Sequence, residues 1–278
     1  MQIIDTLEGL QDYLNTLKKK NRTLGFVATM GALHHGHLTL INRAKKECNE
    51  VICSIFVNPL QFNNQEDFNK YPITLDEDKK MLESASCNAL FLPTRDMMFP
   101  SEPKMQYDLG KLDLVLEGEY RPGHFQGMAA VVEAFLRLLK PDRAYFGEKD
   151  YQQLAIIQWL VKEKSLKTKV VPCKTARNNK GLAMSSRNYR LIKEELKTAE
   201  KIYEMMNYCK VNKLKSPREL VAKSKKYLSE NFEVEYFNIV DEKSLDDLNS
   251  WQDSESPRVF VAAKLSGVRL IDNMSLID

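Results

Sequence analysis

The octet MGALHHGH at residues 30–37 organises the chain and decides its fold. Three of the four histidines in the sequence lie within it. The apolar stretch 24–29 before the octet predicts a buried strand, and the stretch 38–48 after it places Ile41, Ala44 and Cys48 at helical spacing. We therefore expect the octet to turn from a strand into a helix, with glycines where the backbone must bend or approach a ligand.

The position of this turn predicts a phosphate site. The carboxyl end of a parallel strand is where α/β folds bind nucleotides, and the N-terminus of the next helix favours anions through its N–H groups and dipole. Two other readings of His34 and His37 are a satisfied pair of surface histidines and a metal site. The metal reading is weaker, because zinc needs three or four ligands and no Cys, Asp or Glu stands near the pair.

Composition indicates an ordinary globular protein. A chain of 278 residues can form one large domain or two modest ones. No apolar run reaches the length of a membrane span, and the first residues are polar and amphipathic, unlike a signal peptide. Five cysteines, an odd number without a Cys-x-x-Cys pair, fit reduced thiols in a cytoplasm better than a disulfide framework. We therefore expect a cytoplasmic location and no membrane partner.

The net charge of +3 argues against a dedicated nucleic-acid-binding protein. The charge is uneven, because residues 193–230 hold ten Lys and Arg against six Glu. This segment is either a basic patch for nucleic acid or phosphate, or a solvated helical surface. The second reading is favoured, since no aromatic residues interleave with the basic ones in a binding pattern.

Strand and helix patterns alternate through the first part of the chain. Apolar runs predict further buried strands at 51–57, 89–92, 143–146 and 169–173. Helical spacing predicts helices at 6–20, 74–84, 128–139 and 151–164. Thr74 and Glu77 have the spacing of a capping box at the start of the second of these helices. The alternation is typical of an α/β fold with a doubly wound, Rossmann-like parallel sheet.

The rhythm changes after a turn at 178–181. Helices around 196–206 and 217–229 precede three strands at 233–240, 258–263 and 268–272, and the last two strands pair as a hairpin at Gly267. We therefore expect two domains. Residues 1–176 form the Rossmann-like domain, and residues 177–278 form a smaller C-terminal α+β domain.

Polar residues follow two of the predicted strands. Asn58 and Gln61 are neutral hydrogen-bonding residues suited to a small polar substrate, although Asn58 could simply hold a turn with the proline after it. Gly147 allows close approach, Lys149 can meet phosphate as a point charge, and Asp150 suits a helix cap or a ribose hydroxyl. Gly-Glu-Lys-Asp is, however, also a plain surface turn.

A second candidate phosphate motif lies where the two domains join. Ser185, Ser186 and Arg187 offer two hydroxyls and a guanidinium that can wrap a triphosphate. Alternatively, Ser186 is a helix N-cap and Arg187 is solvated. Together with His34 and His37, this Met-Ser-Ser-Arg turn resembles the two ATP motifs of the His-x-x-His nucleotidylyltransferase and class I synthetase superfamily.

Further stretches narrow the resemblance. The chain is similar to the pantothenate synthetase family at TMGALHHGH (29–37), SIFVNPLQF (54–62), RPGHF (121–125), PDRAYFGEKD (141–150), GLAMSSRN (181–188) and the ending RLIDN (269–273). The departures are small. His35 and Asn63 replace a frequent Glu and Gly, and Lys174 and Ala176 alter the approach to the second ATP motif, where Arg177 remains. They put only the fit of the adenine pocket in question.

The resemblance implies a reaction. It implies ATP-dependent condensation of (R)-pantoate with β-alanine to pantothenate, a coenzyme A precursor, through an enzyme-bound pantoyl adenylate, with release of AMP and pyrophosphate. Adenylation is needed because a carboxylate is a poor electrophile until its oxygen becomes part of a leaving group. The resemblance also implies Mg²⁺, with unassigned ligands, and a homodimer. The alternatives are another nucleotidylyltransferase of the superfamily and a basic RNA-binding protein.

The resemblance also implies roles for residues. Catalysis would rest on the donors at the phosphates, with His37 as the proton donor: His34, His37, Lys149 and Arg187. Pantoate would contact Met30, Asn58, Gln61 and Gln153, and β-alanine would contact Gln61. The residues implied to bind ATP are Met30, Gly31, Ala32, Leu33, His34, His35, Gly36, His37, Gly147, Glu148, Lys149, Asp150, Ala176, Met184, Ser185, Ser186 and Arg187. Of these, Gly147, Asp150 and the Ala176 backbone would take adenosine.

Overall fold

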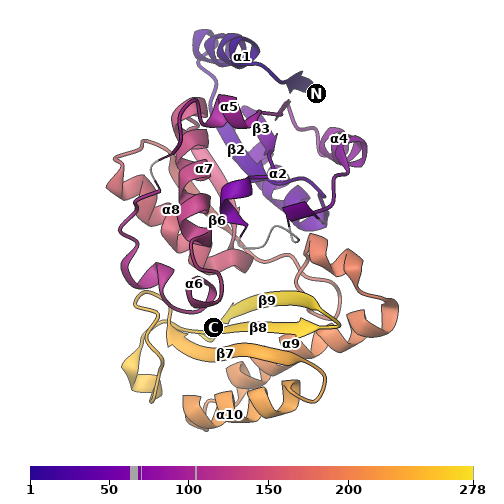
Figure 1. The fold of residues 1–278 in the computed structure, drawn as a ribbon, viewed down its shortest axis with the longest axis vertical. Helices are drawn as coiled ribbons and strands as arrows, with labels where there is room; N and C mark the ends of the chain where they lie inside the picture. The colour runs from indigo at the N-terminus through magenta and orange to yellow at the C-terminus, as the bar shows by residue number, and fades with distance from the viewer. Residues whose placement is uncertain (63–67, 70, 104, 278) are drawn as a thin grey trace. The chain divides into compact units, whose positions relative to one another are not determined.

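A computed structural model describes residues 1–62, 68–69, 71–103 and 105–277 (Figure 1). The chain divides into two compact units, Met1–Gly147 with Gln152–Lys174, and Glu148–Tyr151 with Thr175–Asp278. The second unit thus begins two residues before the expected boundary and also takes the turn at 148–151. Asn63 lies outside the described residues. Within the described ranges, no helix has both the length and the hydrophobicity needed to cross a bilayer.

The first unit is built on a parallel sheet of six strands, in the order β1-β4-β3-β2-β5-β6. The strands are β1 (Gln2–Ile4), β2 (Leu24–Thr29), β3 (Glu50–Ile55), β4 (Ala89–Phe91), β5 (Arg143–Gly147) and β6 (Lys169–Cys173). All but β1 fall on the predicted apolar runs. The sequence does not reveal β1, because three residues are too few to show a period; its pairing with β4 at the sheet edge defines it.

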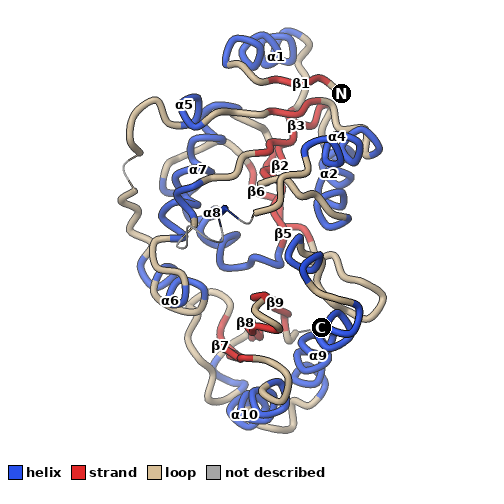
Figure 2. The backbone as a smooth tube through the Cα atoms, turned by 45° about the vertical axis from the view of Figure 1, so that its right-hand side comes forward, coloured by secondary structure: helices blue, strands red, loops and turns tan. Residues whose placement is uncertain are grey.

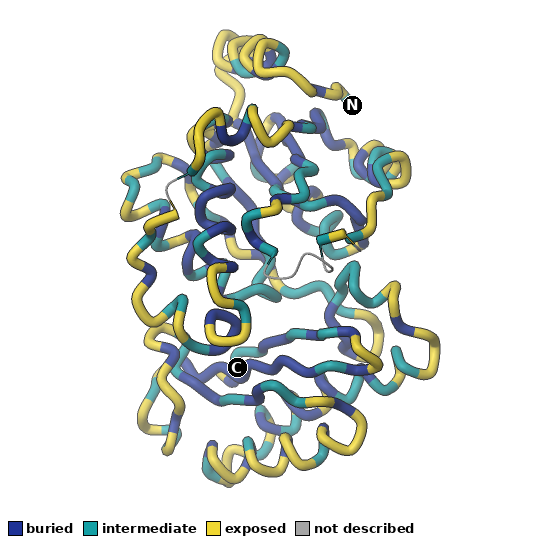
Figure 3. The backbone as a smooth tube through the Cα atoms, in the orientation of Figure 1, coloured by how far each residue is buried: buried dark blue, intermediate teal, exposed yellow. Residues whose placement is uncertain are grey.

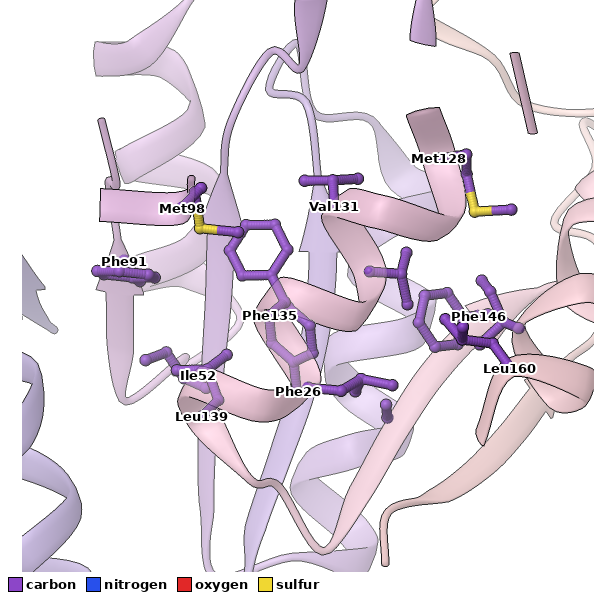
Figure 4. Packing of buried hydrophobic residues seen from close by; sticks show 14 of the residues in the cluster. Phe26, Ile52, Phe91, Met98, Met128, Val131, Phe135, Leu139, Phe146 and Leu160 are labelled. Atoms are coloured by element: carbon purple, nitrogen blue, oxygen red, sulfur yellow. The ribbon is translucent and has the colours of Figure 1, made fainter. Parts of the chain in front are cut away.

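Helices cover both faces of this sheet. Residues of α1 (Leu7–Lys19), α7 (His124–Leu139) and α8 (Tyr151–Glu163) pack on one face, and residues of α2 (His35–Glu47) and α4 (Leu75–Ser84) pack on the other. Successive strand residues alternate between the two clusters. Phe26 meets Phe135 of α7 with ring centroids 5.3 Å apart (Figure 4), whereas Val27 belongs to the cluster under α2. The predicted doubly wound α/β fold is confirmed.

Three helices differ from the predictions in detail. Two short ones, α5 (Arg95–Met98) and α6 (Glu117–Tyr120), lie in a stretch without helical periodicity. The capping box predicted for α4 is wrong. Thr74 makes no side-chain cap bond, and its hydroxyl instead donates to the Asp78 carboxylate at 3.2 Å.

The second unit holds an antiparallel sheet of β7 (Glu233–Asp241), β8 (Pro257–Leu265) and β9 (Val268–Ser275) (Figure 2). α9 (Lys193–Val211) and α10 (Pro217–Leu228) pack on one face of it. The central strand, β8, is buried along nearly its whole length (Figure 3). The predicted hairpin is confirmed, since Ser266 and Gly267 both have positive φ, 49° and 74°, which suits a two-residue turn between β8 and β9.

The strand order of the six-stranded sheet locates a ligand crevice. β2 pairs with β3 on one side and with β5 on the other. The chain runs from β2 outward through β3 and β4, then returns to β5, so the strand order reverses between β2 and β5. Open α/β sheets bind ligands outside the carboxyl ends of the strands at such a switch point. The octet follows β2 directly, and Gly147 ends β5.

Candidate active site

The two histidines of the octet cap the helix that follows. α2 begins at His35, with His34 as its N-cap. Nδ1 of His34 accepts the backbone N–H of Gly36 at 3.0 Å, and Nδ1 of His37 accepts the backbone N–H of His34 at 3.2 Å. The centroids of the His34 and His37 rings are 4.0 Å apart, with 33° between the ring planes. The first turn of α2 therefore fixes the geometry of the pair.

These bonds determine which ring nitrogen carries the hydrogen. A nitrogen that accepts an N–H bond has its lone pair in use, so the hydrogen of each neutral ring lies on Nε2. Both His34 and His37 thus present an Nε2–H donor of the kind that phosphate oxygens accept. His34 is buried and His37 is partly exposed, whereas His35 is exposed. His34 and His37 thus cap the helix, whereas the exposed His35 takes no part in the cap.

A carboxylate that sequence analysis missed holds the turn in front of the histidines. Asp78 of α4, only 1% exposed, accepts the backbone N–H of Ala32 at 3.0 Å and of Leu33 at 2.7 Å. Gly31 and Ala32 both have positive φ, 81° and 48°, so this turn is strained at a residue that carries a Cβ. The Asp78 carboxylate offsets that strain by satisfying two consecutive N–H groups.

A sequence signal for Asp78 does exist. Leu75, Asp78 and Leu82 are spaced three and four residues apart, so an acidic residue stands on the apolar face of the α4 pattern. A buried carboxylate is stable only when it is hydrogen-bonded, which predicts a partner. The pattern does not say which backbone provides that partner, since Ala32 and Leu33 lie more than 40 residues earlier.

Three residues expected to bind the acid substrate lie together in the first unit. Nε2 of Gln61 donates to Sδ of Met30 at 2.9 Å, and Nδ2 of Asn58 donates to Oε1 of Gln61 at 3.2 Å. Asn58 also donates to the carbonyl of Gly127 at 3.0 Å, and its own Oδ1 accepts the N–H of Leu60 at 3.2 Å. Asn58 is 1% exposed. Its amide is committed to holding the Gln61 turn.

Two residues of α7 support the same turn. Gly127 approaches it closely, because a Cβ on Gly127 would lie 2.0 Å from the carbonyl oxygen of Leu60. Nδ1 of the buried His124 lies 2.8 Å from the carbonyl oxygen of Gln61, and because a carbonyl only accepts, that nitrogen donates. His124 lies in the stretch RPGHF (121–125), and the family resemblance implies no role for it.

The second unit gathers the other phosphate-binding candidates. Lys149, Ser185 and Arg187 line one pocket, together with Asn188 and residues of β9. Ser185 caps the 3-10 turn 186–190, and its hydroxyl accepts the N–H of Arg187 at 3.2 Å. The structure therefore brings the lysine of the 148–151 turn to the Met-Ser-Ser-Arg motif, which the sequence separates by more than 30 residues.

The loop before this motif is tied to β9. The guanidinium of Arg177 forms a two-pronged ion pair with the buried Asp272, with N–O distances of 2.5 and 2.9 Å. Burial raises the pKa of the Asp272 carboxyl, and the Arg177 charge opposes that rise. The carbonyl of Ala176 accepts the N–H of Met184 at 2.9 Å. The approach and the motif thus form one hairpin-like loop.

Glu148 and Asp150 lie on the turn that carries Lys149, Ser186 lies on the 3-10 turn 186–190, and Gln153 lies in α8. Glu148, Asp150, Ser186 and Gln153 are partly exposed, and Gln153 stands in the first turn of α8. The Asp150 carboxylate lies 3.8 Å from Nζ of Lys149 and has 45% of its side chain exposed.

Two alternatives from the sequence concern a metal site at His34 and His37 and the basic segment 193–230. The described part of the chain holds no group of three or more His, Cys, Asp or Glu side chains that could ligate a metal, so the metal reading of His34 and His37 lacks its remaining ligands. The basic segment 193–230 forms α9 and α10, where Lys223 lies over the ring of Tyr208, 4.3 Å from its centroid.

Known proteins match the chain over its full length. The family model described as pantoate-beta-alanine ligase matches residues 2–275. The pantothenate synthetase of Cytophaga hutchinsonii is 43% identical over 280 residues, which cover 99% of each chain. The pantothenate synthetase of Porphyromonas gingivalis is 38% identical over 284 residues, which cover 100% of each chain.

Solved structures agree. The crystal structure of pantothenate synthetase from Thermus thermophilus matches with a TM-score of 0.91 and 36% identity, covering 100% of each chain. The pantoate-beta-alanine ligase of Francisella tularensis, complexed with beta-gamma ATP and beta-alanine, matches with a TM-score of 0.81 and 38% identity, covering 99% of this chain and 98% of that one. The predicted family is confirmed: the chain belongs to the pantoate–β-alanine ligases, also named pantothenate synthetases.

Proposed function

We propose that this protein condenses (R)-pantoate with β-alanine by way of an enzyme-bound pantoyl adenylate, consuming ATP and releasing AMP and pyrophosphate. The observation that carries the proposal is the capped histidine pair at the switch point of the sheet. Both rings are set to donate from Nε2 at a helix N-terminus. The Francisella tularensis relative, solved with beta-gamma ATP and beta-alanine, supports ATP and β-alanine as substrates.

In the first half-reaction, the pantoate carboxylate attacks the α-phosphorus, the bond to the oxygen that bridges the α- and β-phosphates breaks, and pyrophosphate leaves. Negative charge builds on the phosphate oxygens during this step. Preorganised donors stabilise such charge because they need no reorganisation during the step. We assign that role to the Nε2–H groups of His34 and His37, with His37 as the proton donor. Lys149, Arg187 and the hydroxyls of Ser185 and Ser186 hold the triphosphate.

Pantoate carries hydroxyls and an apolar dimethyl carbon besides its carboxylate. We assign its polar contacts to the amides of Gln61 and Gln153, and its apolar contact to Met30, whose sulfur already meets the Gln61 amide. Asn58 acts through Gln61, because its own amide is used within the protein. β-Alanine then attacks the adenylate carbonyl beside Gln61, and AMP leaves.

The two units divide the work. We propose that the first unit binds pantoate and activates the α-phosphate through the octet. The second unit, which includes the turn at 148–151 and the second ATP motif, holds phosphate through Lys149 and Arg187. Gly147, Asp150 and the Ala176 backbone take adenosine.

Mg²⁺ fits this arrangement as a companion of ATP. The ion keeps several waters and is usually bound through one or two carboxylates and the substrate phosphates. The described residues offer no cluster of three acidic or histidine ligands, which suits an ion carried mainly by the triphosphate. Asp150, beside Lys149, is a partly exposed carboxylate that could contribute. When bound, the ion neutralises phosphate charge.

Isotope exchange between pyrophosphate and ATP tests the proposal. If the enzyme forms a pantoyl adenylate, the first half-reaction runs in both directions, so exchange requires pantoate and Mg²⁺ but no β-alanine. Release of ADP without exchange would indicate an acyl phosphate and contradict the proposal. Exchange that ignores pantoate and needs another co-substrate would favour a nucleotidylyltransferase that retains the nucleotide on its product.

We also propose that the protein is a homodimer, as the family resemblance implies. An apolar groove beside α7, outside the residues assigned to substrates, offers a surface for association: Met97, Met98, Phe99, Pro100, Pro103, Tyr107, Ala130, Glu133, Ala134, Arg137 and Leu138 line it. Light scattering after size exclusion should give twice the mass of the chain, and a monomer at every concentration would refute the proposal.

A further inference from the structure

The side chain of Asn273 clamps the turn that carries Lys149. Asn273 lies in β9 and is 3% exposed. Its Nδ2 donates to the backbone carbonyl of Glu148 at 2.9 Å and to that of Lys149 at 2.8 Å. Both amide hydrogens are therefore spent on two consecutive carbonyls of the 148–151 turn. This clamp explains why the turn belongs to the second unit, although the chain enters it from β5.

The orientation of the Asn273 amide is fixed by its other end. Oδ1 of Asn273 accepts from Nη1 of Arg258 at 2.7 Å, and Nε of Arg258 donates to Glu242 at 3.0 Å. The Arg258 guanidinium also lies 3.9 Å from the ring centroid of Tyr151, the last residue of the turn. A flipped amide would set its NH₂ against the guanidinium and its oxygen against two carbonyls, so only one orientation satisfies every partner.

The clamp sets where Lys149 stands relative to the second ATP motif. Residues 269–272 of β9, immediately before Asn273, line the same pocket as Lys149, Ser185 and Arg187. β9 thus contributes to this pocket in two ways. Its residues 269–272 line the pocket, and its Asn273 holds the backbone of Lys149, which lines the pocket too. A lysine acts on phosphate as a point charge, and its effect depends on its distance from the charge that develops. The position of Lys149 in this pocket is therefore set by the Asn273 amide.

We propose that Asn273 is a positioning residue for Lys149, which it holds in place for phosphate charge stabilisation during adenylate formation. The inference rests on the proposed function of Lys149. It extends that function to the stretch RLIDN (269–273), for whose side chains the family resemblance implies no role. The amide of Asn273 is used within the protein, by Arg258, Glu148 and Lys149. Its effect on the reaction passes through the backbone of residues 148 and 149.

The test is a double-mutant cycle between Asn273→Asp and Lys149→Ala. Asn273→Asp keeps an oxygen for Arg258 but places the other oxygen against two carbonyls, so the clamp opens with little change in volume. A misplacement of about 1 Å can cost about 100-fold in rate, so pyrophosphate exchange should fall by about tenfold to 100-fold. The KM for pantoate should stay unchanged, because the pantoate contacts lie in the first unit.

The cycle separates positioning from a general loss of structure. If Asn273 acts through Lys149, adding Asn273→Asp to Lys149→Ala should change exchange by no more than about twofold, since coupled residues are not additive. The same cycle is measured for ATP affinity by calorimetry, which needs no turnover. Losses that multiply in the double variant, or an Asn273→Asp variant with wild-type exchange and affinity, would overturn the inference.

Asn238→Asp is the matched control. Asn238 and Asn273 both pair with Phe260 in register, on opposite sides of β8, but the Asn238 amide donates to Asp247 instead. The control variant should keep wild-type exchange. If Asn273→Asp does not fold by circular dichroism, Asn273→Ser removes the same donors without adding charge and enters the same cycle. Wild-type protein without pantoate-dependent exchange would defeat the proposed function, while the affinity cycle would still decide the role of Asn273.

Discussion

The carboxylate of Asp78 accepts the backbone N–H of Leu33 at 2.7 Å, immediately before the histidine that caps α2. A second bond from the Ala32 N–H and a third from the Thr74 hydroxyl complete the shell of this buried group. The direction in which the histidine pair leaves β2 is therefore set by Asp78 of α4, a helix to which no substrate contact is assigned. Changes in α4 should reach the chemistry through this carboxylate.

Asp78→Asn should destabilise the fold and slow adenylation. The amide keeps one acceptor oxygen but turns an NH₂ toward the Ala32 N–H, which leaves a buried donor without an acceptor. Such a loss costs about 1–3 kcal/mol. Urea unfolding should show the lower stability, and pyrophosphate exchange at saturating ATP should fall. Asp76→Asn, two residues earlier at an exposed position with 84% of its side chain accessible, should leave both unchanged. Equal effects of the two variants would contradict the role of Asp78.

Lys149→Ala should fold normally and lose most of its adenylation rate. Removing one donor from developing phosphate charge typically costs about 2.7–4 kcal/mol of barrier, or roughly 100-fold to 1,000-fold in rate. Exchange at saturating ATP and pantoate measures the loss. Lys180→Ala, at an exposed position in the same unit, is the control and should behave as wild type. A near wild-type rate for Lys149→Ala would make this lysine an ordinary surface residue.

Gln153→Ala should raise the KM for pantoate more than the KM for ATP, because its amide is assigned to the acid. The neighbouring Gln152 offers a contrast. It is 2% exposed, and its amide donates to the carbonyls of Leu112 and Val115 and accepts the N–H of Glu117. Gln152→Ala should therefore lower the unfolding midpoint. If Gln153→Ala shifts both Michaelis constants equally, Gln153 lies outside the pantoate contacts.

Gly127→Ala should weaken pantoate binding and lower stability together. The added methyl would stand 2.0 Å from the carbonyl oxygen of Leu60, so α7 and the Gln61 turn must separate. Overpacking of this kind typically costs about 1–3 kcal/mol. Thermal unfolding measures the stability, and the KM for pantoate reports the displacement of Gln61. An unchanged unfolding temperature would show that the turn moves away at no cost.

Much of the fold was predictable because its signals are local. Continuous apolar runs mark β2 through β6, and helical spacing marks α1, α2 and α7, because each pattern reports burial within a few residues of itself. The octet was recognisable as a strand-to-helix turn for the same reason. Its histidine spacing matches the first turn of α2, where His34 and His37 cap the helix. The sequence by itself thus determined the fold class and the family.

Other features were decided only by the tertiary structure. Asp78 reaches Leu33 across 45 residues, and Asn273 reaches Lys149 across 124. Either side chain could have found a different partner within the same secondary structure, because a hydrogen bond between distant segments leaves no period in the sequence. The tautomer of the two histidines, in contrast, follows from hydrogen bonds within the octet itself. Local pattern specifies which residues are buried, whereas the packing of distant segments specifies which polar groups they meet.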